Sequence, residues 1–97
     1  MSGLRFEWDE RTNRTNRRKH GVAFDEAASV FLDDDALLID DPDHSEQEDR
    51  FVLLGMSRIR VLVVCHCYRS GGDVIRIISA RKADRAEEAL YLERRRR

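Results

Sequence analysis

In this 97-residue chain, the residues whose types and spacing best suit a chemical role are positively charged side chains on one predicted strand. The stretch over residues 74–83 is rich in β-branched residues, carries Arg76 within it, and ends with Arg81 and Lys82. Arg76 interrupts apolar residues at a position of period two, so a rigid sheet is expected to hold its charge. A guanidinium group binds two phosphate oxygens at once, and this cluster therefore suits a phosphate.

Five predicted strands and three predicted helices must position this cluster. Apolar or alternating runs predict strands over residues 4–8, 36–40, 50–56, 60–68 and 73–80. Helices are predicted from an N-cap at Asp9 to a stop at Gly21, from Phe24 to the aspartates at 33–35, and from an N-cap at Asp84. The order β-α-α-β-β-β-β-α predicts an α+β fold with an antiparallel sheet packed by helices. A chain of 97 residues with 41% hydrophobic content supports one domain, 1–97.

The first predicted helix is unusual, because it has no large apolar residue between Glu10 and His20. Burial of apolar surface therefore does not hold it in place. The residues that recur at helical spacing are Asn13, Asn16, Arg17 and His20. We expect these side chains to pack through hydrogen bonds.

The other two helices carry capping signals of unequal quality. Glu26 stands at the capping-box position of the second helix, but Ala23 stands where a capping hydroxyl is preferred, at a cost of about 1 kcal/mol. In the last helix, Glu87 lies three residues after Asp84 and completes a capping box. The residues that share one side of that helix are Ala86, Ala89, Leu90 and Glu93.

Bulk composition excludes some classes of protein. A formal net charge of −1 argues against binding nucleic acid through overall charge, although 38% charged residues allow strong local asymmetry. The longest strongly apolar run, residues 61–65, is too short to cross a membrane, so we expect a cytoplasmic protein. Cys65 and Cys67 lie two apart on a strand, roughly 6.5 to 7 Å between Cα atoms, which favours reduced thiols over a disulfide.

Three more patches accompany the strand over residues 74–83. They are Phe6, Glu7, Trp8, Asp9 and Glu10; Lys19, His20, Gly21 and Val22; and Asp41, Pro42, Asp43, His44, Ser45 and Glu46. With them, nearly the entire chain resembles the BrnT family of type II toxins. The resemblance implies a RelE-like fold, a ribonuclease activity that inhibits translation, and neutralisation by a small DNA-binding antitoxin similar to BrnA. Operator DNA is then reached only through the antitoxin.

RNA cleavage without a metal requires a base for the 2′-hydroxyl, cations for the charge that develops on the phosphate, and an acid for the leaving oxygen. We expect Arg76 and Arg81 to form the cationic clamp, with His66 as the candidate base. The residues expected to bind or position RNA are Lys82, Arg58, Arg60 and Arg69. No cofactor and no metal are expected.

Each of these residues also has a structural interpretation. Arginines at strand ends are mostly solvated or paired with surface carboxylates. A histidine on an apolar strand is more often a hydrogen-bonded core residue than a catalyst. If His66 shares a face with Arg76, the cation lowers the pKa of the imidazole and keeps a neutral base near pH 7.

Two groups of potential metal ligands and one basic helix are weaker signals. Asp40, Asp41, Asp43 and His44 lack a recognised ligand spacing, which favours a solvated loop or an interface to a basic partner. On a strand, His66 points away from Cys65 and Cys67, so these three residues do not form a metal triplet. A backbone-binding role and a solubility role remain equally open for Arg11, Arg14, Arg17 and Arg18.

The leading hypothesis is therefore an endoribonuclease toxin that cleaves RNA without a metal on a basic sheet surface. The rival hypothesis is a non-catalytic module whose cations bind an acidic protein partner. RNA incubated with the pure protein discriminates between them. Only the enzyme removes full-length RNA in EDTA and loses that activity in Arg76→Ala.

Overall fold

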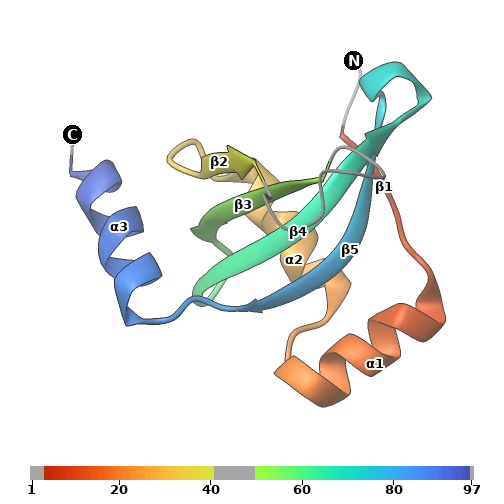
Figure 1. The fold of residues 1–97 in the computed structure, drawn as a ribbon, viewed down its shortest axis with the longest axis horizontal. Coiled ribbons are helices and arrows are strands. Elements are labelled where there is room, and N and C mark those ends of the chain that lie inside the picture. The colour runs from red at the N-terminus through yellow and green to blue at the C-terminus, as the bar shows by residue number, and fades with distance from the viewer. Residues whose placement is uncertain (1–3, 41–49, 97) are drawn as a thin grey trace.

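A five-stranded sheet with strand order β1-β5-β4-β3-β2 organises the molecule (Figure 1). The computed structural model describes residues 4–40 and 50–96. The strands are β1 (Arg5–Glu7), β2 (Leu37–Asp40), β3 (Phe51–Met56), β4 (Val61–Arg69) and β5 (Val74–Lys82). The helices are α1 (Glu10–His20), α2 (Phe24–Ser29) and α3 (Arg85–Arg95), with 3-10 turns η1 (Val30–Leu32) and η2 (Ser70–Gly72). The predicted α+β class and element order are confirmed.

The sheet is mixed rather than wholly antiparallel. Strands β2 to β5 form the predicted antiparallel meander. Strand β1 instead lies parallel to β5, with Glu7 opposite Arg76. The expectation of an antiparallel sheet is wrong at this strand, because alternation within a short strand does not determine the direction of its neighbour.

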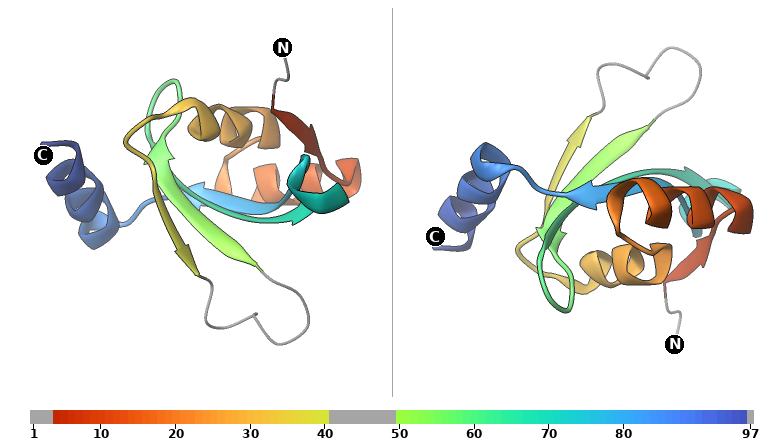
Figure 2. Two further views of the ribbon diagram at one scale, coloured as in Figure 1. Left: turned by 90° about the horizontal axis from the view of Figure 1, so that it is seen from above. Right: turned by 90° about the horizontal axis from the view of Figure 1, so that it is seen from below.

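Helices α1 and α2 lie on the same side of the sheet, and α3 stands apart from them (Figure 2). The main core lies under α2 and η1, where Phe24, Ala27 and Val30 pack with Leu62 and Val64 of β4. Gly55 lies so close to η1 that an added Cβ would come within 2.9 Å of Val30 and Ala36 side-chain atoms. Among the described residues, none of the helices has the length and apolar character to span a membrane.

Helix α1 is anchored by amide side chains, as its sequence predicts. Asp9 caps it by accepting hydrogen bonds from two backbone N–H groups, and Gly21 ends it in the left-handed conformation at φ 72°. Within α1 the only buried residues are Asn13 and Asn16. His20 and Arg17, the other members of the predicted stripe, are exposed.

The start of α2 shows one confirmed and one wrong prediction. Ala23 provides no side-chain cap, as expected. Asn13 of α1 compensates, because its Oδ1 accepts a 2.8 Å hydrogen bond from the Phe24 N–H. The capping-box interpretation of Glu26 is wrong, since its carboxylate points to the β3–β4 turn and binds Ser57 and Arg60.

Helix α3 has the predicted capping box but a different buried side. Asp84 and Glu87 exchange hydrogen bonds of 2.8 and 2.9 Å. Tyr91 is the only buried residue of the helix, and it packs with Leu54, Val61 and Val63. The predicted side that contains Leu90 is exposed, because the anchor of α3 is the Tyr91 hydroxyl bonded to Asp33 across 58 residues of sequence.

Candidate functional site

A β-bulge brings the two predicted clamp arginines to one face of the sheet. On β4, Cys65 pairs with Ser79 of β5, and the next residue, His66, pairs with Ile77. Ile78 is therefore an extra residue on β5. Arg76 and Arg81, five residues apart, would otherwise point to opposite faces. Their register partners on β4, Cys67 and Val63, are four apart and share a face, so the two arginine Cα atoms lie about 13 Å apart on that face.

We call this surface the open face and define it by five residues of three strands. They are Glu7, Arg69, Arg76, Ser79 and Arg81. Among the described helices, α2 covers the opposite side, α1 lies along the outer edge of β5, and α3 covers the open face only at the end where Tyr91 packs. The side chains of Arg69, Arg76 and Arg81 are 57%, 36% and 44% exposed, so they are accessible to a ligand.

Glu7 joins two of these arginines. Its Oε2 accepts a 2.9 Å hydrogen bond from Arg76 Nη1 and lies 3.0 Å from Arg69 Nε. The three residues come from β1, β5 and β4, so the cluster depends on the parallel pairing of β1 with β5. A carboxylate between two guanidinium groups holds both cations in place while their remaining N–H groups stay available to a phosphate.

Arg81 lies at the other end of the open face and is tied to α3. Its Nη1 and Nη2 donate to the two carboxylate oxygens of Glu87, each at 2.8 Å. Glu87 Oε1 also accepts from the Asp84 N–H. This hydrogen-bonded pair raises the pKa of Arg81 and lowers that of Glu87, so the charged forms of both are favoured.

His66 does not lie with the arginines. It pairs in register with Phe51 and Ile77 on the helix-covered side and is fully buried. Its ring packs edge-on against Phe31 at 4.8 Å, and Nε2 lies 3.2 Å from the Tyr68 hydroxyl. Burial lowers the pKa of His66, whereas the shift expected from Arg76 required a shared face that the two residues do not have.

Three of the four predicted RNA-binding residues lie elsewhere. Arg60 binds both oxygens of Glu26 at 2.8 and 3.0 Å and the Gly21 carbonyl at 2.8 Å, on the helix-covered side. Arg58 is exposed in the β3–β4 turn. Lys82 pairs with Leu62, so its side chain starts from the face opposite Arg81. Arg69 alone joins the open face.

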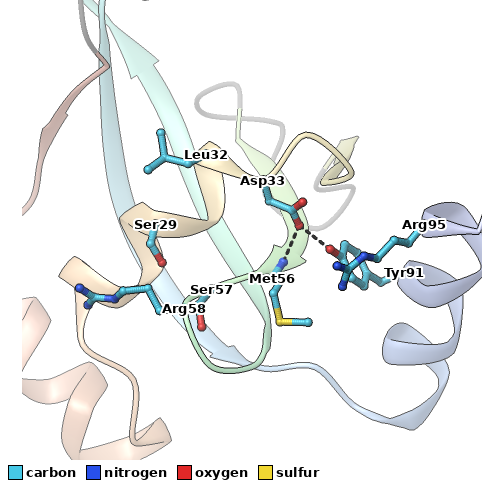
Figure 3. Close-up of a pocket in the computed structure, with 8 residues that line it drawn as sticks. All are labelled: Ser29, Leu32, Asp33, Met56, Ser57, Arg58, Tyr91 and Arg95. Atoms are coloured by element: carbon cyan, nitrogen blue, oxygen red, sulfur yellow. Dashed lines mark hydrogen bonds between the residues drawn. The ribbon is translucent and has the colours of Figure 1, made fainter.

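A separate pocket of about 280 Å³ lies between η1, the β3–β4 turn and α3 (Figure 3). Asp33 forms one wall, and its Oδ2 accepts hydrogen bonds from the Met56 N–H and the Tyr91 hydroxyl. Arg58 and Arg95 lie on opposite sides of the pocket, with their guanidinium groups well apart. The pocket contains neither Arg76 nor Arg81, so it is distinct from the open face.

Sequence reasoning missed Glu7 as a site residue. The available signal was its place in an alternating strand, where Phe6 packs inward and Glu7 must point to the other face. Among the residues that the structure describes, no group of three His, Cys, Asp or Glu side chains could hold a metal ion. The acidic patch over residues 41–49, including His44, lies outside the described residues.

The fold and the open face together define a small α+β protein whose sheet presents arginines suited to phosphate groups. Comparison with known proteins is more specific, because the model for the "ribonuclease toxin, BrnT, of type II toxin-antitoxin system" matches residues 8–87. The chain therefore belongs to the BrnT family of ribonuclease toxins, and the resemblance seen in the sequence is confirmed. The RelE-like assignment stays a prediction.

A solved structure supports the same conclusion. The chain is similar to the Brucella abortus ribonuclease toxin BrnT, with 25% sequence identity and a TM-score of 0.63. The likeness covers 86% of this chain and 100% of the Brucella chain. A search of curated proteins gave no match.

Proposed function

We propose that this protein is the toxin of a type II toxin-antitoxin pair and cleaves RNA on its open face without a metal ion. Membership of the BrnT ribonuclease toxin family supports the RNA-cleaving part of this proposal. The observation that supports cleavage on the open face is the placement of Arg76 and Arg81 on this one accessible face. Such cleavage inhibits translation, and the protein acts in the cytoplasm, where its RNA lies.

Electrostatic stabilisation is the chemistry that the open face supplies. Cleavage by the neighbouring 2′-hydroxyl gathers negative charge on the phosphate oxygens, and fixed cations lower the energy of that state. Arg76 and Arg69 are held together by Glu7, and Arg81 is held by Glu87. Because Arg76 and Arg81 lie about 13 Å apart along the sheet, which exceeds the spacing of adjacent phosphates, we infer that they bind two non-adjacent phosphates of one strand and that the scissile one lies at Arg76.

His66 is not part of this proposal, because a fully buried imidazole does not reach RNA on the opposite face. Lys82, Arg58 and Arg60 are also left out of the proposed contact surface. The partner is an antitoxin that resembles BrnA, neutralises the toxin and contacts operator DNA. Acidic residues on such a partner would compete with RNA for Arg69, Arg76 and Arg81.

Growth arrest tests the proposal in cells. We expect Arg81→Ala to abolish arrest upon induction while the protein stays folded. Glu87→Gln is the matched control, because it weakens the same ion pair and the same helix cap but keeps the cation. Arrest by Glu87→Gln but not by Arg81→Ala supports a role of the guanidinium in RNA cleavage.

The opposite pattern would contradict the proposal. If folded Arg81→Ala still arrests growth, Arg81 has no place in the mechanism. If both variants fail equally, the effect comes from loss of the Arg81–Glu87 pair and not from contact with RNA. Circular dichroism and thermal unfolding of both variants establish that the proteins compared are folded.

A further inference from the structure

The open face still needs a base for the 2′-hydroxyl, because His66 lies in the core. Such a base must be a titratable side chain within reach of a phosphate bound by Arg76. Among the described residues, the carboxylates that bind arginines of the open face are Glu7 and, at the α3 end, Glu87. Asp9, which lies near Arg76, instead uses its carboxylate to cap α1. Glu7 and Glu87 differ in how their oxygens are used.

Both oxygens of Glu87 are committed to other groups. Arg81 binds each oxygen, and Oε1 also accepts the Asp84 N–H that closes the capping box. Proton uptake by Glu87 would therefore weaken both its ion pair with Arg81 and the helix cap. Glu26 is used in the same way by Arg60 and Ser57, on the helix-covered side of the sheet.

Glu7 is arranged differently. Arg76 and Arg69 both bind Oε2, so Oε1 is the oxygen that can accept a further proton. The side chain is 39% exposed, and strand pairing places it directly opposite Arg76. A phosphate bound to Arg76 would therefore lie beside this carboxylate, and the 2′-hydroxyl that attacks such a phosphate belongs to the adjoining ribose.

We propose that Glu7 is the general base of the cleavage reaction, an inference that rests on the proposed function. Glu7 Oε1 removes the proton of the 2′-hydroxyl, and the 2′-oxygen forms a bond to the adjacent phosphorus. The bond from phosphorus to the 5′-oxygen breaks, and that oxygen takes a proton from water. The hydroxide that remains takes the proton from Glu7. Arg76 and Arg69 stabilise the extra negative charge, and the products are a 2′,3′-cyclic phosphate and a 5′-hydroxyl.

Glu7→Gln tests this role with a side chain of the same shape that still accepts hydrogen bonds from the arginines. The assay uses the purified full chain and a short RNA oligonucleotide in EDTA. We expect kcat to fall by about 10²- to 10⁴-fold. RNA affinity should stay the same or increase, because a negative charge beside the bound phosphate is removed. Glu7→Asp should recover part of the rate, and Glu88→Gln, on the exposed first turn of α3, should behave as wild type.

The pH dependence separates a base from a residue that only holds the arginines. The charged groups that face Glu7 are Arg76 of β5, Arg69 of β4 and Arg5 of its own strand, and Asp9 lies near Arg76. Because a general base must be deprotonated to act, wild-type kcat should rise with pH on the acid side, and Glu7→Gln should lose that rise.

The outcomes are distinct. If the wild type cleaves RNA and Arg76→Ala does not, but Glu7→Gln cleaves at the wild-type rate, Glu7 is not the base and the proposed function stands. A slower Glu7→Gln with an unchanged pH profile would also overturn the inference, because it indicates positioning alone. If the wild type leaves RNA intact, the proposed function and the role of Glu7 fall together.

Discussion

Asn16 binds both backbone polar groups of Ala80, the residue before Arg81. Its Nδ2 donates to the Ala80 carbonyl at 2.8 Å, and its Oδ1 accepts from the Ala80 N–H at 3.1 Å. Strand β1 covers the outer edge of β5 only over residues 74–76, so the Asn16 amide takes the place of a neighbouring strand further along. Helix α1 thereby fixes the part of β5 from which Arg81 projects.

Asn16→Ala should destabilise the fold strongly. It leaves the Ala80 N–H and carbonyl without their buried partner and also removes the bond to the Val22 carbonyl. We expect a loss of about 3 kcal/mol in the free energy of unfolding, measured by urea denaturation. Arg17→Ala, one residue along α1 and exposed, should have little effect. Equal stability of the two variants would refute the anchoring role of Asn16.

The sequence predicted the elements of this fold better than their spatial relations. The asparagine stripe, both α1 caps and the α3 capping box follow from local chemistry, and local patterns indicated them correctly. The direction of β1, the bulge at Ile78 and the burial of Tyr91 depend on residues distant in sequence. No spacing rule within one strand or helix contains that information.

The same limit explains the site predictions. Spacing within β5 places Arg76 and Arg81 on opposite faces, and only the bulge brings them together. His66 belongs to an apolar strand whose two faces look alike in sequence, so the pattern could not indicate which face the imidazole joins. Arg60 resembled other surface arginines until the structure showed its pairing with Glu26.

Arg60 and Arg69 should respond differently to truncation. Arg60→Ala removes the partner of Glu26, whose side chain is only 12% exposed, and we expect a loss of about 2 kcal/mol in unfolding free energy with RNA affinity unchanged. Arg69→Ala removes an exposed cation of the open face, so it should weaken RNA binding with little loss of stability. RNA binding by fluorescence anisotropy and urea denaturation measure the two effects. The reverse assignment of the two phenotypes would contradict the site described above.

The Arg60–Glu26 pair should also affect stability in acid. The hydrogen bond from Arg60 outweighs burial and lowers the pKa of Glu26 below its ordinary value of 4.5. As the pH falls, the unfolded state therefore binds the proton before the folded state does. The contribution of Glu26 to the free energy of unfolding is complete above about pH 4.5 and is lost as the pH falls through the lower pKa of the folded state. The stability difference between wild type and Arg60→Ala should shrink over that range. A difference that is constant from pH 7 to pH 3 would contradict this linkage.

Tyr91 should affect the stability of the fold at alkaline pH. Burial, together with donation of its hydroxyl to Asp33 at 2.6 Å, raises the pKa of Tyr91 from 10.0 to about 12. The contribution of Tyr91 to the free energy of unfolding is complete below pH 10 and is lost as the pH rises toward its pKa of about 12 in the folded state. We expect Tyr91→Phe to cost about 2 kcal/mol at pH 7. The cost should diminish above pH 10, and thermal unfolding of both proteins across pH 8–12 tests this expectation.

The most direct test of the whole account is the initial rate at which purified wild type and Arg76→Ala cleave one short RNA in EDTA. The open face predicts that the wild type degrades the RNA and that folded Arg76→Ala is slower by about 10²-fold or more, because the cation at the scissile phosphate is missing. RNA that stays intact with the wild type, or equal rates for the two proteins, would contradict a cleavage site built around Arg76.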